Sequence, residues 1–151
     1  MAKFVDNSKY VLNELVRKAE KALTAVGLQA EGYAKLELEN VPRRIDTGLL
    51  RNSITFAVSG QTPNITSYHA SNPSRYGKGD VMPFGYYTGK APKAKDGVPN
   101  VRIGTNVKYA TYVHEGHRYK GRVVAPNRFI KNAISRHSHE YKEIIKSVLR
   151  S

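Results

Sequence analysis

The chain of 151 residues contains no cysteine, which excludes disulfides, thiolate metal ligands and cysteine-based catalysis. Long apolar runs are also missing, and no stretch approaches the about 20 apolar residues that a membrane-spanning helix needs. The first ten residues hold no apolar segment of the length found in signal peptides. These absences fit a reducing, intracellular setting and predict no membrane partner.

Acidic residues are scarce in most of the chain. Residues 1–41 carry six Lys and Arg against six Asp and Glu, whereas residues 42–151 carry nineteen against six. The whole net charge of +13 therefore belongs to the part after residue 41. Such an excess is typical of proteins that meet a polyanion, which can be nucleic acid, a membrane surface or an acidic protein.

The length and composition suit one globular domain, which we expect to span residues 1–151. Apolar residues recur at helical spacing from Leu12 to Leu36, and Pro42 would stop a helix. This pattern predicts one amphipathic helix over residues 8–40, about 50 Å long. Its apolar stripe either packs partly on a neighbouring subunit or lies across the protein's own sheet.

The rest of the chain predicts an α+β fold with a β-rich body over residues 53–124. Ile54, Phe56 and Val58 alternate with other residues, so we expect a strand over 53–58 with residues 64–69 as its partner. Pro126 suits the first position of a helix. We also expect further strands over 101–107 and 118–124, a helical turn over 109–114, and a C-terminal helix over 126–149 packed on a small, mostly antiparallel sheet.

Residues 71–99 differ from their surroundings because they contain four prolines and five glycines. We expect a long loop in which basic and aromatic side chains alternate. Lysine and arginine neutralise phosphates, while tyrosines suit protein interfaces, and we favour protein contact over base stacking. The cations predicted to contact DNA or an acidic partner are Arg75, Lys78, Lys90, Lys93 and Lys95.

The segment His114-Glu115-Gly116-His117 is a candidate metal site, but its two histidines are three residues apart instead of four. We expect a solvated turn there. No nucleophile elbow, phosphate loop or carboxylate pair stands out elsewhere. The sequence therefore predicts no catalytic residue, no cofactor and no metal, and a small metal-dependent enzyme using His114, Glu115 and His117 remains a minor alternative.

Three short motifs follow the N-terminal helix in a fixed order. They are Ile45-Asp46-Thr47-Gly48-Leu49-Leu50-Arg51-Asn52-Ser53-Ile54, Tyr109-Ala110-Thr111-Tyr112-Val113-His114-Glu115-Gly116 and Ala125-Pro126-Asn127-Arg128-Phe129-Ile130. With the long helix, this order resembles the small neck, or tail-completion, proteins of long-tailed bacteriophages, also described as head–tail connector proteins. The second motif departs from the usual pattern at Glu115-Gly116-His117, and the third reads Ala125-Pro126-Asn127-Arg128-Phe129 where the family often has Pro-Ala-Arg-Pro-Phe.

The resemblance implies a structural virion protein without catalytic activity, located in the phage neck and assembled in the host cytoplasm. It implies a sixfold or twelvefold ring of identical subunits between the head-completion protein and the tail-terminator protein. Double-stranded DNA would cross the lumen and make contacts that do not depend on base sequence. A ring of this kind needs a head-to-tail interface that closes.

Under this hypothesis Asp46, Thr47 and Gly48 shape the turn between helix and sheet. Tyr109, Tyr112 and Phe129 are predicted to anchor the core or a subunit contact. The alternative from another class is a non-specific nucleic-acid-binding protein of a phage or mobile element, which would bind DNA or RNA tightly in solution and lose affinity steeply with salt.

Overall fold

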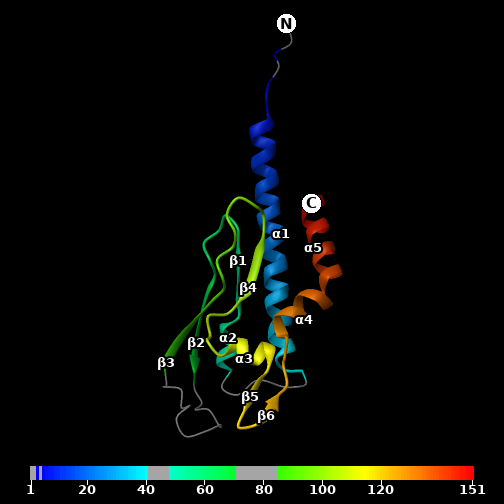
Figure 1. Cartoon of the computed structure of the whole chain (residues 1–151). Coiled ribbons are helices and arrows are strands. Elements are labelled where there is room, and N and C mark those ends of the chain that lie inside the picture. Colours follow the sequence, from blue (N-terminus) through cyan, green and yellow to red (C-terminus); the bar gives the residue numbers. More distant parts are fainter. Residues whose placement is uncertain (1–2, 4, 41–47, 71–84) are drawn as a thin grey trace.

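The computed structural model describes residue 3 and residues 5–40, 48–70 and 85–151 of the chain. The fold is α+β, as the sequence predicts: a long N-terminal helix, small antiparallel sheets and a helical C-terminal segment (Figure 1). The elements are α1 (Ser8–Glu37), α2 (Leu49–Ser53), β1 (Thr55–Val58), β2 (Ile65–Ala70), β3 (Gly85–Lys90), β4 (Val101–Gly104), α3 (Ala110–Glu115), β5 (His117–Tyr119), β6 (Arg122–Val124), α4 (Phe129–Arg136) and α5 (Ser138–Arg150).

Helix α1 confirms the long helix expected over residues 8–40 and ends three residues earlier. Its 30 residues correspond to about 45 Å at 1.5 Å per residue. At its start the Asp6 carboxylate accepts the Ser8 backbone N–H at 2.9 Å. Hydrogen bonds from Ser8 lower the pKa of Asp6, because they stabilise its charged form. No helix in the described part of the chain combines the length and the hydropathy that crossing a membrane requires.

The strands form three antiparallel pairs, and their pairing differs from the prediction. Strand β1 pairs with β4, and β2 pairs with β3 instead of with β1. The expected loop over residues 71–99 is therefore wrong at Gly85–Lys90, which forms a strand. Gly89 accounts for part of the difference between loop and strand. A Cβ at this position would lie 2.3 Å from the Ser53 carbonyl oxygen, so only glycine lets the strand approach α2 this closely.

The segment predicted as one strand over residues 118–124 is a hairpin of β5 and β6. Lys120 and Gly121 form its turn with φ angles of 47° and 76°. Two positive φ angles at adjacent central residues are typical of the tight turn whose twist matches that of the flanking strands.

The C-terminal segment is two helices, not the single helix expected over residues 126–149. Helix α4 begins at Phe129, so Pro126 precedes it instead of occupying its first position. The break lies at His137, and across it the Tyr141 hydroxyl donates to the Ala133 carbonyl oxygen at 2.6 Å. Both helices pack along α1, and Tyr141 shares a cluster with Val26 and Ala30 that also meets Val101 of β4.

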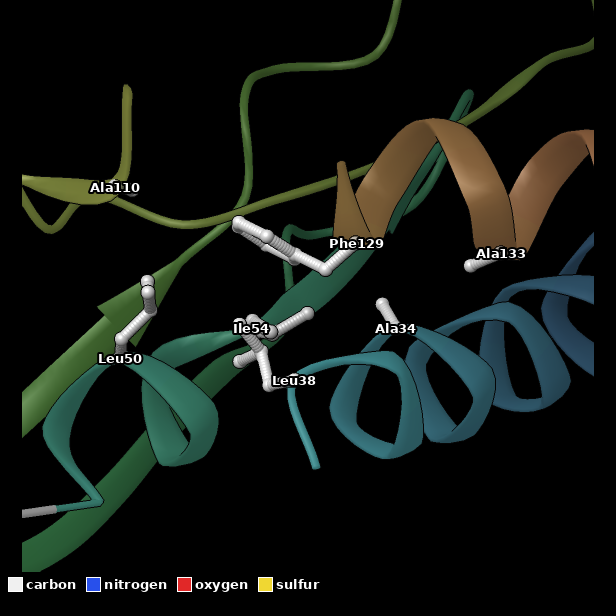
Figure 2. Close-up of a cluster of buried hydrophobic side chains, with 7 residues drawn as sticks. All are labelled: Ala34, Leu38, Leu50, Ile54, Ala110, Phe129 and Ala133. Carbon is white, nitrogen blue, oxygen red and sulfur yellow. The ribbon is translucent and has the colours of Figure 1, made fainter. Parts of the chain in front are cut away.

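The main core is the place where the three sequence motifs meet (Figure 2). The first motif contributes two apolar side chains through α2 and the residue after it, the second contributes one from α3, and the third contributes the fully buried Phe129. Helix α1 adds Ala34, Leu38 follows the end of that helix, and α4 adds Ala133. Its buried members are Ala34, Leu38, Leu50, Ile54, Ala110, Phe129 and Ala133. The motifs therefore supply the core, which explains their apolar pattern.

Candidate functional site

The N-terminal part of α1 extends beyond the rest of the molecule (Figure 1). We call residues 8–20 the free half of α1 and residues 21–37 the packed half, because buried residues begin at Ala22. Large apolar side chains of the free half are open to solvent, with Leu12 61% and Leu15 53% exposed, and Val11 and Val16 are similar. An apolar stripe of this size on one helix face marks an interaction site.

The stripe continues into a hollow between α1 and the loop before β4. This hollow has a volume of about 240 Å³ and is lined on the helix side by Val16, Ala19 and Leu23. Val98 and Pro99 line the opposite side, and Val98 is itself exposed. The apolar stripe of the free half therefore leads into a recess that an apolar side chain can enter.

Three of the five basic residues predicted in the loop lie in the described part of the chain, and one of them forms an ion pair. Lys90 is the last residue of β3, where its backbone N–H donates to the Asn106 side chain at 3.2 Å. Lys93 forms an exposed ion pair with Asp96 at 3.1 Å. Lys95 is exposed and follows in the same segment. The other two predicted cations, Arg75 and Lys78, lie outside the described residues.

The motif residues that were predicted to form the turn or to anchor the core lie in different environments. Gly48 precedes α2 with a φ of 80°, and its carbonyl oxygen accepts the Asn52 N–H. This left-handed conformation is one that glycine adopts without strain. Phe129 is fully buried in the main core, whereas Tyr109 and Tyr112 are exposed at the ends of the first turn of α3. Asp46 and Thr47 lie outside the described residues.

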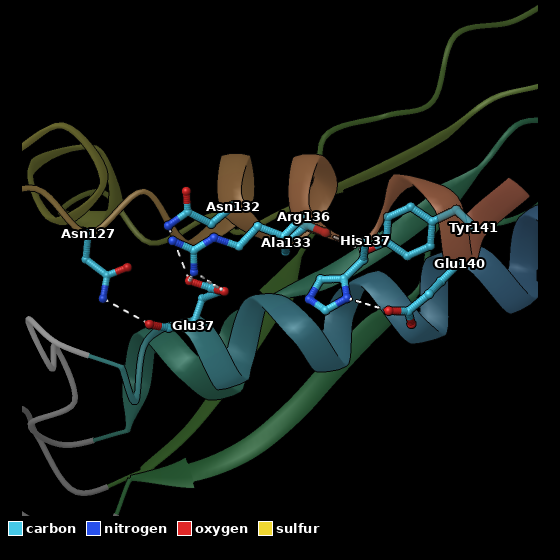
Figure 3. Close-up of polar contacts among 8 residues, drawn as sticks. All are labelled: Glu37, Asn127, Asn132, Ala133, Arg136, His137, Glu140 and Tyr141. Atoms are coloured by element: carbon cyan, nitrogen blue, oxygen red, sulfur yellow. Dashed lines mark hydrogen bonds and ion pairs between the residues drawn. The ribbon is translucent and has the colours of Figure 1, made fainter.

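A polar cluster joins the end of α1 to α4 (Figure 3). The Glu37 side chain is only 8% exposed, and its carboxylate accepts hydrogen bonds from Arg136 at 2.9 and 3.0 Å. Asn132 donates to the same carboxylate at 3.2 Å. Asn127 donates to the Glu37 backbone oxygen at 3.0 Å, so it satisfies a carbonyl at the helix end. Each polar group of Glu37 is matched, which gives this cluster a structural role.

A second polar group lies at the break between α4 and α5. The His137 ring stacks on Tyr33 with 3.4 Å between centroids, and its Nδ1 lies 2.9 Å from Glu140. The Tyr33 hydroxyl also donates to Glu140. These hydrogen bonds, the one with His137 first, lower the pKa of Glu140, and the bond to Glu140 raises the pKa of Tyr33. The arrangement holds α5 against α1.

Burial raises the pKa of Tyr141 to about 12, with smaller effects of Tyr33 and Glu140. Its hydroxyl is therefore neutral at physiological pH and serves as the donor to Ala133. This hydrogen bond stabilises the helix junction.

The possible metal site around His114 has a structural explanation. His114 Nε2 accepts the Lys131 backbone N–H at 3.4 Å, near the start of α4, and Nδ1 lies 2.7 Å from the Glu115 carboxylate. The hydrogen bond with His114 lowers the pKa of Glu115. The His117 ring packs edge-on against Tyr112. Within the described ranges no group of three or more His, Asp or Glu residues could hold a metal ion.

The β5–β6 hairpin is a basic surface that sequence reasoning missed. Arg118, Lys120 and Arg122 are all exposed, and the ion pairs found among the described residues involve none of them. The available signals were the Lys120-Gly121 turn pair and the absence of any acidic residue over 116–139. A single strand over residues 118–124 leaves no place for a turn, so neither signal points to a hairpin under that prediction.

Comparison with known proteins gives no relative: no family model matches the chain, and neither a curated protein nor a solved structure is significantly similar. Three surfaces of the molecule bear on its function. These are the apolar stripe of the free half, the hollow beside it and the basic hairpin.

Proposed function

We propose that this protein is a structural subunit of a bacteriophage neck, where it forms a ring between the head-completion and tail-terminator proteins. The observation that carries the proposal is the free half of α1, where Val11, Leu12 and Leu15 are each more than half exposed to solvent. Exposed Leu12 and Leu15 make sense in a protein whose mature state is an assembly. The order of the three motifs, which resembles that of neck proteins, supports the same function.

A head-to-tail ring needs two different surfaces on each subunit that fit one another. The free half supplies one of them, and it lies in the electrically neutral part of the sequence, so many copies can approach without strong repulsion. The hollow beside Val98 extends this surface toward the body. We therefore propose the free half as the main subunit contact in a sixfold or twelvefold ring.

In such a ring the basic body would face the DNA in the lumen or the acidic surfaces of neighbouring rings. The exposed Lys90 and Lys95 remain candidates for these contacts, while Lys93 is partly neutralised by Asp96. Phosphate contacts fix position but carry no base sequence information, which suits a channel through which the whole genome passes.

The first experiment locates the protein. Immunogold electron microscopy of purified virions should place it at the head–tail junction. Presence in infected cells together with absence from virions would contradict the proposed function.

The second experiment tests the interface with a matched pair of variants. Leu15→Glu puts a charge on the stripe, and Leu28→Glu makes the same change at an exposed leucine of the packed half, on another side of the helix. We expect light scattering to show loss of the oligomer for Leu15→Glu and retention for Leu28→Glu. Equal behaviour of the two variants would show that the stripe is not the subunit contact.

The basic hairpin favours a second function, that of a non-specific nucleic-acid-binding protein of a phage or mobile element. Gel shifts of the unassembled protein at two salt concentrations separate the two functions. A neck subunit should bind DNA weakly until it is assembled, whereas the second function requires tight binding that weakens steeply with salt.

A further inference from the structure

We propose that the β5–β6 hairpin is the element with which this protein contacts the phosphate backbone of double-stranded DNA. The inference concerns a binding surface and holds for either function proposed above. It assigns DNA contact to Arg118, Lys120 and Arg122, and not primarily to the loop cations Lys90, Lys93 and Lys95.

The charge of the hairpin is the first argument. Three cations lie within five residues, all exposed, and none takes part in an ion pair with the described acidic residues. The segment from 116 to 139 contains no Asp or Glu at all. Among the described loop cations, Lys93 is paired with Asp96, whereas Lys90 and Lys95 lack an ion pair within the described ranges but lie further apart in the sequence. A cation without an acidic partner releases more counterions from DNA when it binds a phosphate.

The shape of the hairpin is the second argument. Arg118 is opposite Val123, and Tyr119 is opposite Arg122, so the two arginines point to opposite faces of the ribbon. Lys120 lies at the turn between them. All six strand residues are exposed or half-buried, so neither face is covered by the body. A two-stranded ribbon with cations on both faces and at its end suits a DNA groove, whose two walls both carry phosphates.

The backbone at the turn is the third argument. Lys120 has a φ of 47° and is the only non-glycine residue of the described chain with a positive φ. Asparagine is favoured at this position of such a turn because its short polar side chain can hydrogen-bond locally, whereas the Cβ of most other residues disfavours a positive φ. A lysine that is kept in a strained conformation at an exposed turn is consistent with a binding role.

The position of the hairpin agrees with this role. The hairpin projects from the end of the molecule that lies opposite the free half of α1 (Figure 1). One end can therefore contact another subunit while the other contacts DNA. Tyr119 and Val123 are also exposed, and Lys120 lies over the Tyr119 ring with 5.4 Å to its centroid.

The test compares two triple variants with the same change in charge. One is Arg118→Gln, Lys120→Gln and Arg122→Gln in the hairpin, and the other is Lys90→Gln, Lys93→Gln and Lys95→Gln in the loop. Binding of each full-length variant to a mixed-sequence DNA duplex is measured by fluorescence anisotropy over a range of low salt concentrations. Circular dichroism checks that each variant keeps its helical content.

We expect the hairpin variant to lose affinity by about tenfold or more and its log–log salt slope to fall by about 3, one for each phosphate contact. The loop variant should change the slope by less than about 1. Equal losses in both variants would mean that net charge alone drives binding and would overturn the inference. A larger loss in the loop variant, or no loss in the hairpin variant, would also overturn it.

A second measurement does not depend on variants. Acetylation of Lys120 by a lysine-reactive reagent, quantified by mass spectrometry, should slow when duplex DNA is added, while acetylation of Lys142 on α5 should not. Equal protection of the two lysines would contradict the assignment. Because the virion location is tested separately, failure of the hairpin experiments would leave the proposed neck function standing, and the reverse also holds.

Discussion

The two halves of α1 follow the same helical spacing of apolar residues, yet most of the buried positions of the packed half hold small residues, with Val26 as the larger apolar exception. The packed half meets β1, α4 and α5 with Ala22, Gly27, Ala30 and Ala34, small residues that allow close approach. The free half carries large leucines and valines that are each more than half exposed, of which Val16 also lines the hollow beside Val98. Periodicity predicts which face of a helix is apolar, and residue size indicates how closely its own body approaches that face.

The largest expected effect comes from a matched pair of leucines. Leu38→Ala removes a fully buried side chain from the main core and should lower the free energy of unfolding by about 2–5 kcal/mol. Leu15→Ala in the free half should change the free energy of unfolding of the monomer by less than about 0.5 kcal/mol. Urea denaturation at a protein concentration low enough to keep the monomer measures both. Similar losses would show that the free half is covered within the monomer.

A matched pair of glutamates extends the comparison to polar contacts. Glu37→Gln weakens the charge-assisted bonds with Arg136 and Asn132 in a nearly buried cluster and should cost about 1.5–3 kcal/mol. Glu14→Gln removes only a solvent-exposed pair with Arg17, so a change below about 0.5 kcal/mol is expected. Thermal unfolding of the two variants decides this, and an equal shift in Tm would argue against a structural role of the Glu37 cluster.

A matched pair of glycines tests close packing within the packed half. A Cβ at Gly27 would lie 2.3 Å from the ring of the buried Phe56, so Gly27→Ala should destabilise the protein by about 1–3 kcal/mol. No atom lies within 4 Å of a Cβ at Gly32, and Gly32→Ala should stabilise α1 by about 0.5–1 kcal/mol. Chemical denaturation gives both values, and stabilisation by Gly27→Ala would show that sheet and helix are not in close contact.

The smallest effect concerns the contact of α5 with the packed half and depends on pH. Tyr141 has a pKa of about 12 in the folded protein and an ordinary value near 10 when unfolded, so the folded state holds its proton more tightly. Stability from this group is complete below pH of about 10 and falls as the pH rises toward 12. Tyr141→Phe should lower the free energy of unfolding by about 1 kcal/mol at neutral pH. Between pH of about 10 and 12 the stability of this variant should fall less than that of the unmodified protein, which Tm measured against pH would show. If Tm fell equally with rising pH in the variant and in the unmodified protein, the burial of the Tyr141 hydroxyl would be contradicted.

The sequence predicts the parts of the fold that depend on local pattern. The limits of α1 follow from its apolar spacing, and β1 and β4 follow from alternation around Phe56 and Ile103. The pairing of β2 with β3 could not be predicted, because Gly85 and Gly89 resemble loop residues until α2 is placed beside the strand. The break at His137 was equally hidden, because the helical spacing continues across it and the stacking on Tyr33 is a tertiary contact.

The candidate site was predicted less completely than the fold. The apolar stripe is visible in the sequence. The sequence does not decide whether the stripe packs on a neighbouring subunit or on the protein's own sheet. The basic surface was assigned to residues 71–99, where proline and glycine suggested an exposed loop. The hairpin carries fewer cations over a shorter stretch, and its exposure on both faces follows only from the turn at Lys120 and Gly121.

The meeting of three distant motifs in one core also constrains how this chain can vary. Leu50, Ala110 and Phe129 come from different motifs but fill one shared volume (Figure 2). A larger side chain at Ala110 needs the space that a smaller one at Leu50 or Phe129 would release, because a filled core tolerates exchange only when its total volume is kept. Substitutions at these positions should therefore be inherited in compensating pairs, and a genetic suppressor of one should arise in another motif.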